Sequence, residues 1–580
     1  MSRSLLRLAL STSLLVALPA VLSSPALACG GFFCSLQQPV DQAAERILFV
    51  KDGEEMVAHV QIQYTGPSEK FSWVVPVPTP PKLSVGSDQL FQTLRSSTQP
   101  QFNLNLRTEG VCRQPDFDGG GAGGSANAPM ASPSAAATAA PSVEVVSQEN
   151  IGPYETVVIK GDDPTELKKW LRDNGYDVPE SIDPLLDPYI KNKMYLLALK
   201  LQKDRGDGDL QPIVMRYLSA KPMIPIQLTA VAATPDMDVQ LWILGSHRAI
   251  PVNYPHVEIN EARLDWMNGG FNYRSLVTEA MNEAGGRGFV TDYAGESRIL
   301  PLDQFDPNRY NLDALRQLSD PVSFARMVQS YFPTTAAWIS FMSRHLPKPQ
   351  AFVDISDANF YGSLETFAEA LRKANLTVNT ASAVKELDET LVMPAREIRR
   401  LFMENPYLTR LYTTLSPDEM TSDPMFDFNP QLPRVALLRQ AEGVRQCNSQ
   451  VYEWEAPIQI TTPKGLKFTL RQNTPFGPSP APNQPAALRI QQLKPSGAAD
   501  LIKDNTSSIQ ASLGSAATPQ TGGATPAPIT RPIQSGAGCA CHSPSTVRTA
   551  EQEIAGASEG LAYMTVMLGW FGWRRWRKKD

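Results

Sequence analysis

Two histidines and a glutamate between residues 247 and 258 are the first side chains whose types and spacing could form a metal site of a hydrolase. His247 and His256 flank a turn that contains Pro251, and Glu258 follows closely. Two imidazoles and a carboxylate are ligands that Zn²⁺ accepts in metal-dependent hydrolases. Their spacing matches no HExxH-type motif, and polar side chains in a turn also satisfy nearby backbone groups. A polar turn is therefore the preferred interpretation, and a metal site is the alternative.

Three aspartates in a glycine-containing segment form a second group of potential ligands. They are Asp204, Asp207 and Asp209. Calcium is held by several carboxylates on a short loop, but this spacing is not that of an EF-hand. Aspartate is also a common turn former. We expect a hairpin loop here, with a calcium site as the alternative.

Other chemical motifs are weaker. The GxSxG string at residues 556–560 has no strand before it, so it does not indicate a serine hydrolase. His59 lies on the more polar side of an alternating strand pattern and is expected at the surface or in a sheet pair. Arg396, Arg399 and Arg400 are expected on a solvated helix face. With 5 histidines and 6 cysteines in all, the sequence leads us to name no catalytic residue and no cofactor.

The cysteines are expected to form disulfides, because the chain carries export signals and disulfides persist outside the cytoplasm. Six cysteines allow many pairings. As a hypothesis we favour Cys29 with Cys34, which enclose a short glycine-containing loop. We pair Cys112 with Cys447, the remaining two in folded-looking sequence.

Cys539 and Cys541 form a CxCH string with His542. Haem attachment requires CxxCH, which is one residue longer, and a structural zinc site needs four ligands. A processing or anchoring role therefore fits these two cysteines better.

The two ends of the chain predict export and membrane attachment. Residues 1–28 have a basic start, an apolar run and the small-x-small site Ala26-Leu27-Ala28, as in a secretory signal peptide; lipid modification of Cys29 is the alternative. Residues 560–573 are uncharged and precede a basic tail from Arg574, which predicts one membrane-spanning segment with the bulk of the chain outside the cytoplasm. An interfacial amphipathic helix is the alternative. The formal net charge of -6 argues against a nucleic-acid partner.

The elements that would position these residues follow from periodicity and turn signals. Asp163 and Pro164 begin a helix that Gly175 ends. The other expected helices are residues 273–284, 364–374 and 393–403. Three strands of a β-meander are expected at residues 46–50, 56–64 and 71–78, the last at a sheet edge because of its prolines. Further strands are expected at residues 155–159, 194–201, 212–218, 226–233, 238–244, 451–455 and 466–470.

We predict an α+β fold in which a β-meander and a mixed α/β unit are followed by a mainly helical region, a disordered stalk and a C-terminal membrane segment. The predicted parts are a signal peptide (1–28), a β-rich segment (29–113), a low-complexity linker (114–148), a mixed α/β unit (149–260), a mainly helical region with closing strands (261–472), a Pro/Ala/Ser-rich stalk (473–552) and a membrane segment with a basic tail (553–580).

Several strings in the body resemble one bacterial family. ACGGFFC at residues 28–34, LGSHRAIPVNY at 244–254 and GGRGFVTDYAG at 285–295 are similar to the exported family labelled domain of unknown function 2330. The resemblance covers roughly residues 28–470 and implies export, but it implies no activity and no catalytic residue. The C-terminus resembles the tripartite surface-anchoring tails of myxobacterial exported proteins, with Cys539–Cys541, the apolar run and the arginine cluster as counterparts.

The expected function is that of an exported, envelope-anchored surface protein that binds an envelope or extracellular protein or polymer. The membrane is its second expected partner. The alternative is an extracytoplasmic hydrolase, with a metal-dependent form that uses His247, His256 and Glu258. An enzyme is the less favoured of the two, and the metal-dependent form requires these three side chains to converge.

Overall fold

The computed structural model describes residues 41–65, 71–113, 143–176, 182–202, 210–331, 336–470 and 484–515, all within one compact unit. The expected signal peptide, residues 1–28, and membrane segment, residues 553–580, lie outside these ranges, as do Cys29, Cys34, Cys539 and Cys541. In the described ranges, no helix has both the length and the apolar character needed to cross a bilayer. The expected combination of helices and strands with a β-rich N-terminal region is confirmed.

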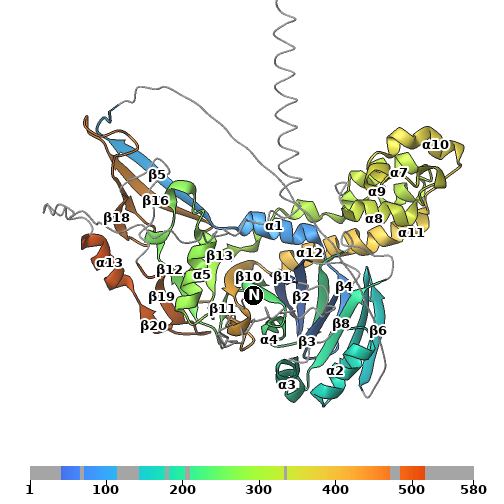
Figure 1. The fold of residues 1–580 in the computed structure, drawn as a ribbon, viewed down its shortest axis with the longest axis horizontal. Coiled ribbons are helices and arrows are strands. Elements are labelled where there is room, and N and C mark those ends of the chain that lie inside the picture. Colours follow the sequence, from blue (N-terminus) through green and yellow to red (C-terminus); the bar gives the residue numbers. More distant parts are fainter. Residues whose placement is uncertain are drawn as a thin grey trace, which may run out of the picture. The chain divides into compact units, whose positions relative to one another are not determined.

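A seven-stranded sheet forms the centre of the unit (Figure 1), in the order β13-β14-β10-β1-β2-β9-β4. The expected hairpin is confirmed, because β1 and β2 pair antiparallel around Gly53, whose φ of 63° suits a glycine turn. On its other side β1 pairs in parallel with β10, far along the chain. The strands are β1 (Asp41–Asp52), β2 (Glu55–Thr65), β4 (Lys82–Val85), β9 (Ile213–Leu218), β10 (Ala233–Gly245), β13 (Val290–Glu296) and β14 (Tyr407–Leu415).

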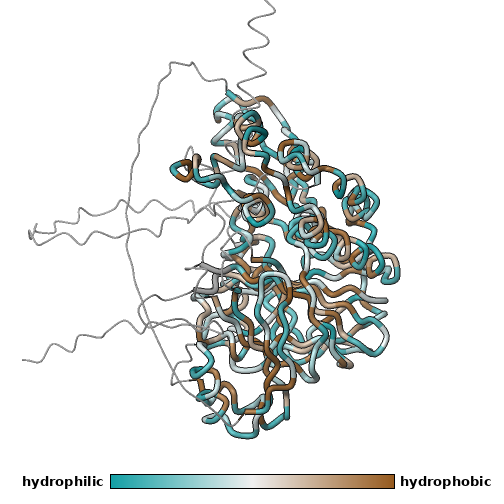
Figure 2. The backbone as a smooth tube through the Cα atoms, turned by 90° about the vertical axis from the view of Figure 1, so that its right-hand side faces the viewer, coloured by the Kyte–Doolittle hydropathy of each residue, from teal (hydrophilic) through white to brown (hydrophobic). Residues whose placement is uncertain are grey.

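A four-stranded sheet, in the order β3-β8-β7-β6, packs against one face of this central sheet. The strands are β3 (Ser72–Val77), β6 (Glu144–Ile151), β7 (Tyr154–Lys160) and β8 (Tyr195–Leu201). Inward side chains of both sheets share one hydrophobic core, which includes Ile47 and Phe49 from β1 and Trp73 and Val75 from β3. In Figure 2 the longest hydrophobic stretches (brown) lie in the strand-containing lower part of the view, while the helices alternate between hydrophobic and hydrophilic residues.

The expected meander is wrong in its third strand. β3 pairs with β8 in the second sheet instead of with β2. Every residue of β3 is buried, so both faces of the strand pack against other parts of the protein. The central sheet covers one of these faces. The expected edge position is confirmed, because β3 ends the four-stranded sheet and Pro76 lies within it.

Helices α2 (Pro164–Asp173) and α3 (Asp183–Lys191) cover the outer face of the second sheet. The Asp163 carboxylate accepts hydrogen bonds from the backbone N–H groups of Thr165 and Glu166, as the capping signal predicts. The buried face of α2 carries the expected side chains Leu167, Trp170 and Leu171.

The opposite face of the central sheet is covered by α1 (Asp88–Thr98) and α12 (Met393–Glu404). These helices bury Leu90 and Leu94 from α1 and Ile398 and Leu401 from α12 against the strands. The central sheet is therefore covered on both faces.

A second core lies where smaller sheets meet α5 (Tyr273–Glu283) and α13 (Thr506–Ser515). The expected stalk is wrong for residues 484–515, because apolar side chains such as Leu488, Ile490 and Ile509 pack into this core. The strands of the smaller sheets are β5 (Gln101–Glu109), β11 (Arg248–Pro251), β12 (His256–Ile259), β15 (Phe426–Asn429), β16 (Leu438–Gln446), β17 (Ile458–Thr461), β18 (Lys467–Leu470), β19 (Ala487–Gln492) and β20 (Asp500–Asp504).

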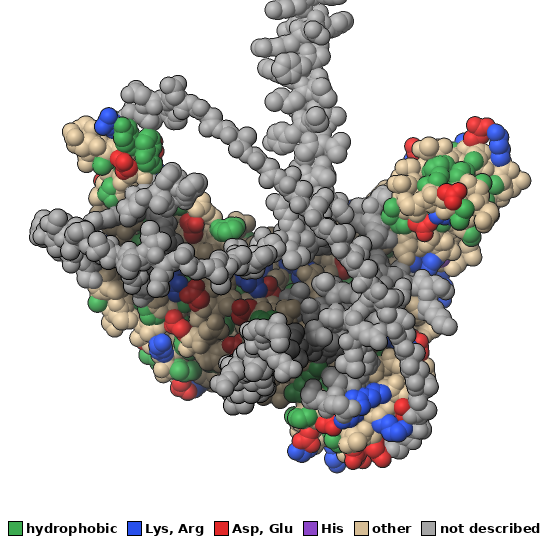
Figure 3. Space-filling view, viewed as in Figure 1, with side chains coloured by type: hydrophobic (Ala, Val, Ile, Leu, Met, Phe, Trp, Pro, Cys, Tyr) green, Lys and Arg blue, Asp and Glu red, His purple; other side chains and the backbone are tan. Residues whose placement is uncertain are grey.

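A helical lobe with a core of its own is inserted between β13 and β14. Figure 3 shows hydrophobic side chains gathered on the visible face of this lobe. Within residues 261–472, α5 precedes β13, the lobe helices and α12 lie between β13 and β14, and β14 to β18 follow. Helices therefore make up more of this region than strands, and most of its strands lie at its end, as expected. The lobe helices are α6 (Leu312–Arg316), α7 (Pro321–Gln329), α8 (Ala336–His345), α9 (Asp357–Gly362), α10 (Ala368–Lys373) and α11 (Thr380–Leu387).

Three smaller expectations are also corrected. The strand expected at residues 226–233 is instead, over its first residues, the short helix α4 (Ile226–Thr229). Its Ile226 packs into the inter-sheet core and its Leu228 into the core beneath α2 and α3. Residues 451–455 form turns with a single β-bridge at Tyr452. The linker expected at 114–148 ends earlier, since β6 begins at Glu144.

The predicted pair Cys112–Cys447 is joined by a disulfide, with a Cα–Cα distance of 4.7 Å. The bond lies just beyond the ends of β5 and β16, which run in parallel from Gln101 and Leu438 onward. It therefore connects two segments that are 335 residues apart in sequence.

Candidate functional site: an apolar pocket between the two sheets

The inward faces of the two sheets position the site. Side chains alternate along a strand, so Ile47 and Phe49 of β1 point to the same face of the central sheet. Ala58 and Val60 of β2 lie beside them, because β1 and β2 are paired in this register. Trp73 and its neighbours on β3 form the opposite wall.

A cavity of about 430 Å³ lies between these walls. Apolar side chains dominate its lining, and polar groups gather at a few positions. The lining residues are Glu45, Ile47, Phe49, Ala58, Val60, Trp73, Val75, Pro76, Val77, Pro78, Asn192, Met194, Met215, Tyr217, Ser219, Ala220, Lys221, Met223, Pro225 and Met425.

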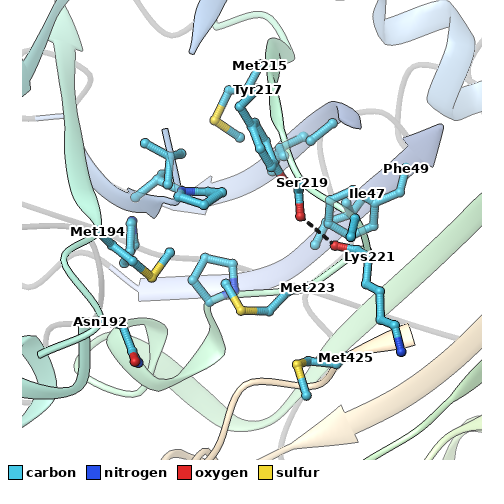
Figure 4. Close-up of a pocket in the computed structure, with 18 of the residues that line it drawn as sticks. Ile47, Phe49, Asn192, Met194, Met215, Tyr217, Ser219, Lys221, Met223 and Met425 are labelled. Carbon is cyan, nitrogen blue, oxygen red and sulfur yellow. Dashed lines mark hydrogen bonds between the residues drawn. The ribbon is translucent and has the colours of Figure 1, made fainter. Parts of the chain in front are cut away.

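Three methionines lie where connecting segments border the cavity (Figure 4). Met194 precedes β8, while Met223 and Met425 are partners in a β-bridge. Met425 is 40% exposed, so this part of the wall reaches the surface. Methionine is flexible and polarizable, and it adapts its shape to different apolar surfaces. This rim can therefore adjust to an occupant, whereas the strand residues behind it are fixed by the sheets.

Polar groups at the open side are held by the protein itself. The Ser219 hydroxyl donates to the Lys221 carbonyl at 2.9 Å, and the Lys221 ammonium pairs with Asp427 at 2.8 Å. Figure 4 shows the Lys221 side chain extending away from Ile47 and Phe49. Lys221 therefore borders the opening without filling the cavity.

Two ionisable side chains contribute to the wall between the sheets. Glu45 is only 4% exposed and shares its inward face with Ile47. Tyr217 is buried, and burial raises the pKa of its phenol above the usual range. Among the described residues, the lining contains no histidine or cysteine.

The zinc candidates do not converge. His247 is exposed and its Nδ1 lies 2.9 Å from the Ser246 hydroxyl, whereas His256 is buried and its Nε2 lies 2.9 Å from the Thr291 hydroxyl. Glu258 forms an ion pair with Lys464 at 3.0 Å. In the described ranges no group of three or more histidine, cysteine or acidic side chains could hold a metal ion. Burial lowers the pKa of His256 to about 3, which suits a neutral core histidine.

The calcium candidates cannot be placed in the same way. Asp204, Asp207 and Asp209 lie outside the described residues. They stay an expectation from the sequence.

His59 lies in a sheet pair, which is one of its two expected places, and not at the surface, because β2 aligns it with Leu48 of β1 and Val214 of β9. It is 2% exposed beneath α12, in the same layer as Val57, and neither ring nitrogen has a hydrogen-bond partner in the described part of the chain. Burial lowers the pKa of His59 to about 4. The alternation was recognised correctly, but both faces of this sheet are covered, so the more polar face is buried as well.

The expected solvated arginine face is wrong for Arg400. Its guanidinium pairs with Asp52 at 2.6 Å and with Glu397 at 2.8 Å. Arg216 of β9 contacts the same two carboxylates, each at 2.6 Å. This network links the β1–β2 turn, β9 and α12. Arg396 is exposed, as expected.

A second charged cluster surrounds the buried carboxylate of Asp292 and was not foreseen. Asp292 has no exposed surface, and it pairs with Arg410 at 3.1 Å and accepts a hydrogen bond from the Tyr273 hydroxyl. Arg439 donates to the Asp292 carbonyl at 3.1 Å. These contacts join α5, β13, β14 and β16, so the cluster helps to hold these four elements in place against one another.

The pocket was missed from the sequence because no local motif marks it. Its residues come from β1, β2, β3, β9 and several connections, and each taken alone has the appearance of ordinary core. The signal that the sequence offers is a charged residue, Glu45, two positions before Ile47 and so on the same face of the expected strand.

Comparison with known proteins places the chain in a family. The chain matches none of the curated proteins and none of the solved structures with which it was compared. A family model described as "uncharacterized protein conserved in bacteria (DUF2330)" matches residues 23–360. This match spans more than half of the 580 residues and includes both packed sheets except β14. The chain therefore belongs to the DUF2330 family of bacterial proteins.

Proposed function

We propose that this chain is an exported, envelope-anchored protein that binds a small apolar molecule between its two packed sheets. The observation that carries the proposal is the cavity of about 430 Å³ with apolar walls and a methionine rim. Small-molecule sites are typically apolar cavities of about 300–1,000 Å³ with a few placed polar groups. This pocket has the size and the composition of such a site.

Three features support export and anchoring. Residues 1–28 have the composition of a signal peptide, and residues 560–579 combine an apolar run with a basic end. The disulfide between Cys112 and Cys447 suits an oxidising compartment. The hydrolase alternative has no comparable support among the described residues, because its zinc candidates do not converge.

Binding can be tested with Nile red, a neutral apolar fluorophore, and the full-length protein. We expect saturable binding that Met194→Trp weakens at least tenfold, because the larger ring at the rim would occupy the cavity. Leu218→Trp is the matched control, since Leu218 is exposed at the end of β9 and does not line the pocket. Equal binding by the unmodified protein and Met194→Trp, with circular dichroism showing both folded, would refute the proposed site.

Localisation needs a separate experiment. Fractionation of the native cells with external protease should find the chain in the envelope fraction, cleaved from outside the cytoplasm. Recovery in the cytosol with residues 1–28 intact would contradict the export proposal while leaving the pocket unaffected.

A further inference from the structure

Two aromatic rings and an arginine are stacked beyond the ends of β5 and β16. The rings of Tyr452 and Trp454 are parallel to within 5°, and their centroids are 4.6 Å apart. The guanidinium of Arg113 lies over the Tyr452 ring, 4.7 Å from its centroid. Because one face of Trp454 rests on Tyr452 and the residue is 43% exposed, its other face is open to solvent. Figure 3 shows hydrophobic side chains gathered at the tip (upper left) where β5 ends in Figure 1.

The backbone holds this stack in one orientation. A disulfide joins Cys112 to Cys447 beside it, and Arg113 forms a β-bridge with Tyr452. The N–H of Glu455 donates to the Tyr452 carbonyl at 3.0 Å, which closes the turn that contains Trp454. A binding surface that is fixed in advance loses little conformational entropy when a ligand binds. Arg, Tyr and Trp are also the residues that most often dominate the energy of a binding surface.

The segments on either side of Trp454 expose polar side chains. A flat apolar face with hydrogen-bonding groups near its edge matches a sugar ring, because C–H bonds cover the faces of that ring and hydroxyls project around its rim. The C–H hydrogens carry partial positive charge, and the face of an aromatic ring is its negative side. Carboxylates accept charge-assisted hydrogen bonds from hydroxyls, while amides both donate and accept. The exposed polar residues of these segments are Asn448, Ser449, Gln450, Glu453 and Glu455.

The charges near the stack compensate one another. Arg113 is offset by Glu455, and two arginine–glutamate ion pairs at the end of β5 and beside the turn each have no net charge. A polyanion such as a nucleic acid binds where basic side chains are in excess. This surface therefore suits an uncharged polymer. The two ion pairs are Arg107–Glu109 and Arg445–Glu453.

We propose that this stack is a binding surface for a neutral polysaccharide, in which one pyranose ring lies flat on the open face of Trp454. Tyr452 supports the indole from its other face, and the exposed carboxylates and amides of residues 448–455 bind the hydroxyls at the edge of the sugar. The surface is separate from the apolar pocket, whose lining includes neither of these aromatic residues. Its occupant is therefore independent of the small molecule proposed for the pocket.

Affinity electrophoresis of the full-length protein tests the inference, in native gels that contain laminarin, barley β-glucan or glycol chitin as neutral polymers and alginate as an anionic one. We expect at least one neutral polymer to retard the protein and alginate not to. Trp454→Ala should weaken that interaction at least tenfold, because it removes the stacking face. Trp454→Phe keeps a smaller aromatic face and should restore most of the retardation.

Phe271→Ala is the matched control. Phe271 is 90% exposed, and its neighbour Gly270 packs against Phe102 at the start of β5, about 23 Å of strand from Glu109 at its end. This variant should be retarded like the unmodified protein, and Trp454→Ala should bind Nile red normally.

Three results would each overturn the inference: no retardation of the unmodified protein by any of the neutral polymers, retardation by alginate alone, or equal retardation of Trp454→Ala and the unmodified protein. A loss in Phe271→Ala as large as that in Trp454→Ala would also overturn it, since exposed aromatic rings in general would then be responsible. None of these results would affect the proposed pocket, which Nile red binding tests separately.

Discussion

At the level of single residues, folding buries two histidines and changes their pKa values. His59 has no hydrogen-bond partner for either ring nitrogen in the described part of the chain, while His256 contacts Thr291. Burial lowers the pKa of both side chains, to about 4 for His59 and to about 3 for His256. Around His59, Glu397 opposes this shift and Arg216 adds to it. Both imidazoles are therefore neutral inside the folded protein at neutral pH.

This neutrality predicts a loss of stability in mild acid. An unfolded histidine binds a proton below a pH of about 6.5, but folded His59 resists protonation until about pH 4. The unfolded state thus binds more protons in this window, so the free energy of unfolding falls as the pH falls through it. His59 alone accounts for at most about 3 kcal/mol, at about 1.36 kcal/mol for each pKa unit.

His59→Leu isolates this contribution. The variant should lose less stability than the unmodified protein between pH 7.5 and pH 4.5, because it has no imidazole to protonate on unfolding. Urea unfolding at several pH values measures the difference. At pH 7.5 the substitution should be nearly neutral, since a partnerless ring is replaced by an apolar side chain. An identical pH dependence in both proteins would show that His59 does not contribute.

Helix α12 is an element fixed by both apolar packing and charge. Its buried face includes Ala395, Ile398 and Leu401, while Glu397 and Arg400 join the ionic network. The hydrogen bond from Arg400 is the largest of the effects that lower the pKa of Asp52 to about 2, against the opposing effect of burial. The network therefore fixes how α12 lies across the β1–β2 turn.

Asp52→Asn should destabilise the protein by about 1–2 kcal/mol, because it removes charge-assisted bonds from both Arg216 and Arg400. The value stays moderate because about a quarter of the side chain is exposed and solvent screens it. Glu404→Gln is the matched control at the exposed end of Arg400 and should cost less than about 0.5 kcal/mol. Equal losses for the two variants in urea unfolding would contradict a role for the network in positioning α12.

The whole unit is connected by contacts between distant parts of the sequence. β1 pairs with β10, β5 pairs with β16, and the Cys112–Cys447 bond spans 335 residues. A long closed loop restricts the unfolded chain strongly, which is the usual way in which a disulfide stabilises a fold.

The double variant Cys112→Ser/Cys447→Ser should unfold with a free energy lower by about 2–5 kcal/mol. Urea unfolding without reductant measures it. Dithiothreitol should lower the unfolding midpoint of the unmodified protein more than that of the double variant. A double variant as stable as the unmodified protein would show that the bond does not constrain the unfolded chain.

The sequence by itself determined the features that depend on neighbouring residues. The Asp163 cap, the end of α2 near Gly175 and the β1–β2 hairpin were predicted because each is fixed by contacts within a few residues. The Cys112–Cys447 pair was also anticipated, through elimination among the cysteines. Only the tertiary structure decided that β3 joins a second sheet and that residues 484–515 complete a core. The pocket could not be predicted for the same reason, because it forms only when strands that are distant in sequence are assembled into the two sheets. Burial on both sheet faces, which no local pattern specifies, placed His59 in the interior and Glu45 beside an apolar cavity.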